Sequence, residues 1–203
     1  MTEDEAQGWI VERFGAEALA RLKRFIEKVV EENEYQNLIS PASVDHVWTR
    51  HVLDSAQLVP LAPDDGEWMD VGTGGGFPGM VVGILRLAPT LLVEPRKRRA
   101  AFLDQCVEAL DLGARVRVLA AKVEQIDGQA AVISARAVAS VEKLLHAALP
   151  CATSATRWLL PRGRFEDADL KQLRESWRGV FHVEQSLTDP ASSILVATGV
   201  APR

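Results

Sequence analysis

The stretch of the chain best suited to chemistry is a run of glycines that begins directly after an aspartate. In Asp70-Val-Gly-Thr-Gly-Gly-Gly-Phe-Pro-Gly79, five glycines fall within nine residues. Glycine has no Cβ, so the backbone can turn sharply and approach a ligand closely. A loop of this kind at the carboxyl end of a first strand is where open α/β sheets bind nucleotides. The sequence therefore predicts a nucleotide-type ligand at this loop.

The register of the glycines distinguishes two such ligands. Gly74, Gly76 and Gly79 match the dinucleotide fingerprint, but that match begins four residues after Asp70 and contains Pro78. The pattern Asp-x-Gly-x-Gly, which ends at Gly74, begins at Asp70 itself and therefore matches the end of the strand better. It suits a ligand with a carboxylate and an amine. We therefore expect S-adenosylmethionine as the cofactor. An NAD-dependent oxidoreductase and a non-catalytic nucleotide-binding module remain the alternatives.

Further polar side chains follow the next strands. Glu94 ends the second strand, 24 residues after Asp70, where a carboxylate can accept both ribose hydroxyls of a nucleoside. Glu124 follows the third strand, and Arg136 follows the fourth. Because the carboxyl ends of parallel strands meet at one edge of a sheet, we expect these side chains to face the same crevice.

The elements that must position these residues follow a turn at Pro63–Gly66, where short apolar runs begin to alternate with helical ones. The pattern predicts helices over residues 80–87, 97–110, 141–149 and 167–177. It predicts strands over residues 67–71, 90–94, 115–119, 130–135, 156–160, 180–186 and 193–198. The link between the last two strands is too short for a parallel crossover. The expected fold class is α/β, with a seven-stranded, mostly parallel sheet and an antiparallel pair at one edge.

The part before this turn has helical periodicity. Apolar residues between positions 4 and 34 predict two helices divided near Gly15, and a loop follows to Pro41. A further helical face runs from Val44 to Pro60. We expect residues 1–65 to form an N-terminal helical cap and residues 66–203 to form the domain that binds the cofactor.

Composition excludes several classes of protein. The chain of 203 residues carries a net charge of −5, and residues 1–68 hold 6 basic and 14 acidic side chains. This balance argues against a non-specific binder of duplex DNA, but it allows an enzyme that docks on RNA through a local basic face. We expect no DNA partner. The run Arg96-Lys-Arg-Arg99 is either a solvated helix face or a phosphate-contacting patch.

The chain also lacks the marks of a membrane or secreted protein. Its longest apolar stretch is far short of the roughly 20 residues that span a bilayer, and its acidic start is unlike a signal peptide. We expect a cytoplasmic protein. Cys106 and Cys151 lack ligand spacing, so neither a metal site nor a disulfide is expected, and both cysteines are assigned to the core.

Several short motifs together resemble one known family. They are Asn37-Leu38, Arg50-His-x-Leu-Asp-Ser55, the glycine loop with its Phe-Pro-Gly ending, Lys97-Arg98, Val123-Glu124 and Ser134-Ala-Arg136. In order and spacing, the region from about residue 25 to 165 resembles the bacterial ribosomal RNA small subunit methyltransferase G family, also called glucose-inhibited division protein B. The resemblance implies a Rossmann-like class I methyltransferase with an N-terminal helical extension.

The resemblance also implies an activity and a set of site residues. The activity is transfer of a methyl group from S-adenosylmethionine to guanine N7 in the decoding-region loop of 16S ribosomal RNA, free or in a small-subunit precursor, by a monomer. Together with the residues argued above, the expected cofactor-binding set is Gly72, Gly74, Phe77, Glu94, Val123, Glu124 and Arg136. The expected substrate-orienting residues are Arg50, His51, Arg136 and Arg162. At Arg162 relatives usually have lysine, whose ammonium lacks the planar fork of a guanidinium. His51 is equally open to a packing role in the cap.

The residues that are missing fit this chemistry. Exocyclic amine methylation usually relies on an Asn/Asp-Pro-Pro-aromatic motif after the fourth strand, where this chain has Ser134-Ala-Arg-Ala137. Cytosine C5 methylation needs a cysteine nucleophile against the base. Guanine N7 already has an exposed lone pair, so direct in-line transfer needs no general base. Proximity and alignment can then supply about 7 to 11 kcal/mol of the barrier.

Overall fold

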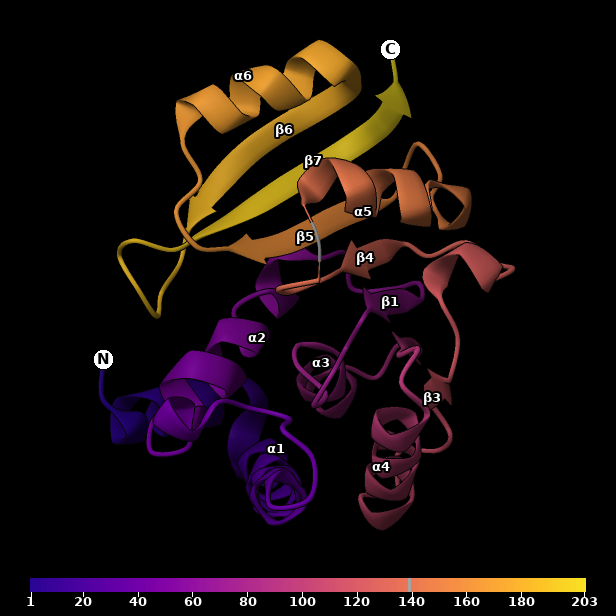
Figure 1. Cartoon of the computed structure of the whole chain (residues 1–203). Coiled ribbons are helices and arrows are strands. Elements are labelled where there is room, and N and C mark those ends of the chain that lie inside the picture. Colours follow the sequence, from indigo (N-terminus) through magenta and orange to yellow (C-terminus); the bar gives the residue numbers. More distant parts are fainter. Residues whose placement is uncertain (139) are drawn as a thin grey trace.

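The computed structural model describes residues 1–138 and 140–203. A seven-stranded sheet lies between two layers of helices (Figure 1). The strands are β1 Trp68–Val71, β2 Thr90–Val93, β3 Val116–Leu119, β4 Val132–Ser134, β5 Arg157–Arg162, β6 Trp177–Gln185 and β7 Ser193–Pro202. The helices of the α/β part are α3 Gly79–Leu85, α4 Lys97–Ala109, α5 Val141–Ala148 and α6 Asp167–Ser176, with short turns η4 Val123–Gln125 and η5 Leu149–Cys151.

The strand order is β3-β2-β1-β4-β5-β7-β6, with β1 to β5 parallel and β7 antiparallel to both of its neighbours. This confirms the predicted sheet and its antiparallel edge pair. Most boundaries shift by one or two residues, and the largest differences lie in the edge pair: β6 begins at Trp177, where a helix was predicted, and β7 continues to Pro202. Trp177 is buried beside Phe181, so packing against the sheet decides its conformation.

Side chains alternate between the two faces of the central strand. Met69 and Val71 pack in one cluster with helices α5 and α6, whereas Trp68 packs on the opposite face with Val82 of α3. Because both faces are covered, the central strands are mostly apolar along their whole length, instead of alternating between apolar and polar residues.

The N-terminal segment begins with α1 Glu3–Asn33, capped by Thr2. Gly15 in its middle has φ 85° and ψ 168°, outside the helical region, so the predicted division near Gly15 is confirmed. The loop from Glu34 to Ser40 follows as expected.

The predicted helical face from Val44 to Pro60 is only partly correct. Instead of one helix, the chain forms η1 Pro41–Ser43, a π-helical turn η2 Trp48–Leu53, α2 Asp54–Ala56 and η3 Val59–Leu61. The backbone N–H groups of Trp48 and Thr49 donate to the Glu3 carboxylate at 2.8 and 2.9 Å. A side chain of α1 thus satisfies the first N–H groups of η2, which a continuous helix would bond internally.

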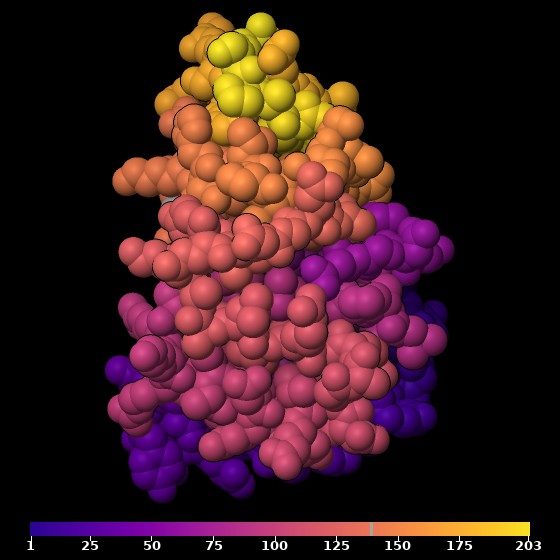
Figure 2. Space-filling model, turned by 90° about the vertical axis from the view of Figure 1, so that its right-hand side faces the viewer, coloured from indigo at the N-terminus to yellow at the C-terminus, as the bar shows by residue number. Residues whose placement is uncertain are grey.

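One hydrophobic cluster joins the N-terminal segment to the α/β part. It contains Phe25 and Val29 of α1 together with Met80 of α3 and Leu103 of α4. The chain ends lie far apart, with N-terminal residues at the base of the molecule and C-terminal residues at its top (Figure 2). Among residues 1–138 and 140–203, no helix has the length and hydrophobicity needed to cross a bilayer.

Candidate active site

The glycine loop between β1 and α3 is anchored by a buried carboxylate. Asp70 accepts hydrogen bonds from the Gly79 backbone N–H at 2.8 Å and from the Ser134 hydroxyl at 2.6 Å. Burial raises the pKa of Asp70, and these hydrogen bonds oppose that shift. A Cβ at Gly79 would lie 2.2 Å from Leu92 Cδ2, so only glycine fits there. Asp70 therefore holds both ends of the loop and is not exposed to a ligand.

Within the loop, Gly72, Gly74 and Gly76 have φ of 68°, 61° and 96°. Residues other than glycine rarely adopt this conformation. The buried carboxylate of Glu94 lies beneath the loop and accepts the Gly74 and Arg96 backbone N–H groups, both at 2.8 Å. A carboxylate has about four acceptor positions. Glu94 thus fixes the loop while keeping acceptor capacity for a ligand hydroxyl.

The predicted site residues gather at one edge of the sheet. Gly72 follows β1, Glu94 follows β2, Glu124 lies after β3 and Arg136 lies after β4, while Arg162 ends β5. These five strands are neighbours and parallel, so their carboxyl ends share this edge.

A cleft of about 850 Å³ opens above this edge. The predicted residues that line it are Arg50, His51, Gly72, Gly74, Phe77 and Arg136. Within the described part of the chain, Glu94, Val123 and Glu124 do not line the cleft: Glu94 and Val123 are buried, and Glu124 is exposed elsewhere on the edge. Arg162 lines a smaller neighbouring cavity of about 240 Å³ that also reaches Arg136, and burial lowers the pKa of its guanidinium.

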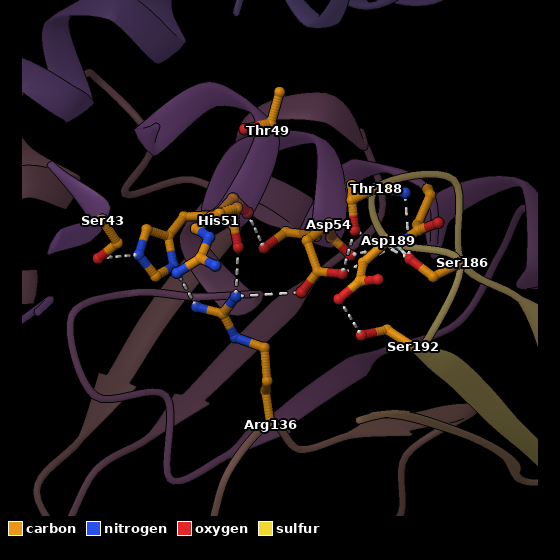
Figure 3. Close-up of polar contacts among 12 residues, drawn as sticks. Ser43, Thr49, His51, Asp54, Arg136, Ser186, Thr188, Asp189 and Ser192 are labelled. Carbon is orange, nitrogen blue, oxygen red and sulfur yellow. Dashed lines mark hydrogen bonds and ion pairs between the residues drawn. The ribbon is translucent and has the colours of Figure 1, made fainter. Parts of the chain in front are cut away.

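The Arg136 guanidinium points into a set of acceptors on the N-terminal segment (Figure 3). Its Nη1 donates to the Arg50 carbonyl at 3.0 Å and to Asp54 Oδ2 at 3.1 Å. Its Nη2 donates to His51 Nδ1 at 2.8 Å. Arg136 was predicted to face the crevice, and it lines the cleft, where a segment more than 80 residues earlier in the chain holds its guanidinium.

These contacts define the protonation state of His51. Arginine only donates, so His51 Nδ1 must be the acceptor, and its Nε2–H donates to the Ser43 hydroxyl at 2.9 Å. Burial and the nearby charges of Arg136 and Arg50 lower the pKa of His51 to about 3. The imidazole is therefore neutral at physiological pH, with both ring nitrogens occupied.

Phe77 lies between the loop and the N-terminal segment. Its ring centroid is 4.9 Å from that of His51 and 5.5 Å from that of Phe25, and the Arg136 guanidinium carbon is 5.5 Å from the ring. Phe77 was predicted as a cofactor contact, and in the structure it also forms an apolar floor beneath the imidazole.

Sequence reasoning did not identify Asp54 as a site residue. Asp54 Oδ1 accepts from Gln57 Nε2 at 3.0 Å and from the Thr188 hydroxyl at 3.3 Å, so the turn between β6 and β7 reaches the same cluster. The spacing of His51 and Asp54 places them on one helical face, which is the local signal that could have indicated a joint role. The contribution of Thr188 has no local signal.

The arginine run at the start of α4 is used partly within the molecule. Arg98 and Arg99 donate to the carbonyls of Tyr35 and Asn37, at 3.4 and 2.8 Å. Both cysteines are buried and free, as expected for core residues, and burial raises the pKa of the Cys106 thiol to about 12.

Comparison with known folds identifies the architecture. The structure resembles the B. subtilis M1A22 tRNA methyltransferase TrmK, with a TM-score of 0.56 and 16% identity, covering 72% of this chain and 65% of that one. It also resembles P. horikoshii TYW2 in complex with MeSAdo, with a TM-score of 0.58 and 15% identity, covering 80% and 64%. The expected Rossmann-like class I methyltransferase fold is thereby confirmed.

Sequence comparison identifies the family. The chain is 43% identical to the ribosomal RNA small subunit methyltransferase G of Novosphingobium aromaticivorans, covering 97% of this chain and 88% of the relative. It is 42% identical to that of Rhizorhabdus wittichii, covering 100% and 95%. The model of the family described as GidB, rRNA small subunit methyltransferase G, matches residues 18–190. Of the functions that the spacing of the glycines left open, the methyltransferase is therefore correct. The chain belongs to the rRNA small subunit methyltransferase G family of enzymes.

Proposed function

We propose that this enzyme transfers a methyl group from S-adenosylmethionine to N7 of a guanine in the decoding-region loop of 16S ribosomal RNA. The transfer is direct and in line, without an obligatory general base. The observation that carries this proposal is that His51 and Asp54 at the cleft, and Asp70 beneath its glycine loop, already have hydrogen-bond or ion-pair partners.

His51 has a guanidinium on Nδ1 and a hydroxyl on Nε2. Asp54 forms an ion pair with Arg136, and Asp70 is sealed beneath the loop. Such groups are poor acceptors for a substrate proton. Methylation of an exocyclic amine must release a proton, whereas guanine N7 reacts through its own lone pair. The arrangement therefore favours N7 over the exocyclic amine.

The thiols give an independent argument against cytosine C5. That chemistry needs a thiolate against the base, and burial raises the pKa of both Cys106 and Cys151. Neither cysteine is among the described residues that line the cleft.

The site fits the proposed cofactor. The loop presents glycines with positive φ at Gly72 and Gly74. We propose that Glu94, which is buried at the end of β2 and already accepts the Gly74 N–H, accepts the ribose hydroxyls through its remaining lone pairs. Val123 and Glu124, after β3, are proposed to contact the other end of the nucleoside. A fold neighbour has been solved with MeSAdo, which supports a nucleoside ligand on this scaffold. When bound, the cofactor supplies the electrophilic methyl group, and the protein orients the base towards it.

The substrate side of the cleft is basic at Arg50 and Arg136, with Arg162 in the adjoining cavity. We propose that these guanidiniums orient the RNA. A bidentate contact to O6 and N7 would cover the reacting lone pair, so a contact to O6 alone or to phosphate is expected. The small-subunit ribosomal RNA, free or in a precursor particle, is the proposed partner of a monomeric enzyme.

The test is methylation of 16S RNA and of small-subunit particles with radiolabelled S-adenosylmethionine, followed by mapping of the product. Cleavage at N7-methylguanine with aniline and mass spectrometry of the nucleosides identify the modified atom. N7-methylguanosine at one decoding-region position supports the proposal. Label on an exocyclic amine or on cytosine C5 would contradict it. Thermal shift with S-adenosylhomocysteine and with NAD separately tests the cofactor.

A further inference from the structure

The cluster around Arg136 joins three parts of the chain. Arg136 follows β4, Asp54 and His51 come from the N-terminal segment, and Thr188 comes from the turn between β6 and β7. Figure 3 shows the guanidinium directed between the imidazole and the carboxylate. Among the residues of this cluster, Arg136 alone follows a parallel strand. The others come from elements outside the parallel part of the sheet, which lie around the glycine-loop site.

The contacts restrict Arg136 more than one ion pair would. Its Nη1 is shared between the Arg50 carbonyl and Asp54, and its Nη2 is bonded to His51. Acceptors on two atoms of a planar fork fix both its direction and its plane. The ion pair is mostly buried, with 19% and 16% of the two side chains exposed, so solvent screens it only weakly.

The carboxylate that holds Arg136 is itself held. Asp54 Oδ1 accepts from Gln57 and Thr188 and leaves Oδ2 for Arg136. Gln57 is buried and also bonds the turn between β6 and β7, through Ser186 Oγ at 3.2 Å and the Leu187 N–H at 2.8 Å. A carboxylate with its own supports is typical of a side chain that orients another one.

The backbone beside Arg136 is also unusual. Ala137 has φ 55°, a conformation that residues other than glycine adopt at some cost in energy. Ala137 lines the cleft with Arg136. The chain thus turns sharply just after Arg136, whose guanidinium is held by Arg50, His51 and Asp54.

We propose that Asp54 is a positioning residue that acts through Arg136, holding its guanidinium against His51 and the Arg50 carbonyl at the wall of the cleft. This inference deepens the proposed function, on which the role of Arg136 in transfer rests. Asp54 also lines the cleft, and in this proposal it acts on transfer through Arg136 rather than through the reacting atoms. Removing it frees the guanidinium without changing the glycine loop.

The test is a double-mutant cycle with Asp54→Ala and Arg136→Ala, read by single-turnover methylation and by calorimetry with S-adenosylhomocysteine. We expect Arg136→Ala to slow transfer about 100-fold and Asp54→Ala about tenfold, the scale on which misplacement of an orienting group acts. In the Arg136→Ala background, Asp54→Ala should change neither the rate nor the affinity by more than about twofold. Independent losses that multiply would overturn the proposal, and so would a wild-type rate in Asp54→Ala.

A spectroscopic readout does not depend on turnover. In ¹⁵N spectra of the imidazole, Asp54→Ala should shift the Nδ1 signal of His51, because the guanidinium leaves that nitrogen. Asp54→Asn keeps the volume of the side chain and should give a smaller shift. Asp45→Ala is the matched control: Asp45 is exposed on the same N-terminal segment, and we expect no shift and an unchanged rate.

The two measurements distinguish the proposed function from the positioning role of Asp54. If wild-type enzyme does not methylate RNA, the proposed function fails, while the His51 signal still tests the contact. If wild-type enzyme is active and Asp54→Ala leaves the His51 signal in place, the positioning role fails alone. Thermal unfolding of each variant shows whether it is folded, and Asp54→Asn provides a second variant should Asp54→Ala unfold.

Discussion

Three acidic residues near the cleft have different roles because their surroundings differ. Asp70 is fully buried and bonds the Gly79 backbone, Glu94 bonds the backbone beneath the loop, and Asp54 pairs with a guanidinium. A buried carboxylate that accepts backbone N–H groups shapes the site, whereas one that holds a cation can position it. Residue type alone could not separate these roles, since all three are carboxylates at the ends of local elements.

At Gly74, substitution should abolish cofactor binding. Gly74→Val forces a branched residue into φ 61° and places its Cβ on the loop that faces the cleft. We expect the affinity for S-adenosylhomocysteine, measured by calorimetry, to fall at least about 100-fold, an estimate that assumes strain and lost contact of about 3 kcal/mol. Gly113→Ala is the control, because a Cβ there meets nothing within 4 Å. Unchanged affinity in folded Gly74→Val would remove the loop from the binding site.

His51 should make stability depend on pH. Its pKa is about 3 in the folded chain and near 6.5 when unfolded, so between these values the unfolded state binds more protons. The free energy of unfolding therefore rises with pH in this window, and His51 stabilises the fold fully above about pH 6.5. On acidification this stability is lost, at up to about 1.4 kcal/mol per pH unit.

Urea unfolding between pH 4 and 7 measures this slope. We expect His51→Gln to flatten it, while His46→Gln, which changes an exposed histidine, should leave it unchanged. Equal slopes in wild-type protein and His51→Gln would mean that His51 is charged in the folded state, contrary to its contact with Arg136.

At the scale of elements, the sequence predicted the parts whose pattern is local. Short apolar runs separated by helical ones predicted all seven strands. The short Thr188–Pro190 link indicated the antiparallel pair. The segment from Val44 to Pro60 was not predictable as short turns, because its conformation depends on a carboxylate of α1. The site shows the same limit. Strand ends located Gly72, Glu94 and Arg136, but contacts from distant segments determine where Arg136 points.

The Glu3 contact with η2 gives a prediction at this scale. Glu3 accepts from the N–H groups of Trp48 and Thr49 and from the Thr49 hydroxyl at 2.7 Å. Glu3→Gln removes the charge from this cap and should lower the free energy of unfolding by about 1 to 2 kcal/mol. Hydrogen exchange at the amides of residues 48–53 should accelerate. Asp4→Asn, on an exposed neighbour, is the control, and an equal effect of both substitutions would refute the specific cap.

At the scale of the whole molecule, an acidic N-terminal part completes a site on a more basic α/β part. Residues 1–68 carry a net charge of −8 and residues 69–203 carry +3. Arg98, Arg99 and Arg136 of the α/β part each donate to carbonyls of the N-terminal part. Opposite net charges and these hydrogen bonds thus join the shared apolar cluster in holding the two parts together. We propose that the boundary near residue 65 separates two roles in one cooperative unit, a helical cap and the methyltransferase domain.

Phe25 tests this cooperativity because it connects the two parts. Its side chain is fully buried, its ring lies 5.5 Å from that of Phe77, and a Cβ at Gly76 would fall 2.7 Å from its Cζ. Phe25→Ala should lower the free energy of unfolding by about 3 to 5 kcal/mol. Because the cluster includes Met80 and Leu103, both parts should lose stability together.

Urea unfolding followed by tryptophan fluorescence and by hydrogen exchange distinguishes the outcomes, since α1 and η2 contain Trp9 and Trp48 and the sheet contains Trp68 and Trp158. In wild-type protein the transitions should coincide, as two-state unfolding requires. In Phe25→Ala they should move together to lower urea. Val30→Ala, at a partly exposed position on α1, should shift the midpoint far less. A transition of residues 1–65 that precedes that of the sheet would show that the cap is an independent domain, and the Arg136 cluster would then open without unfolding the glycine loop.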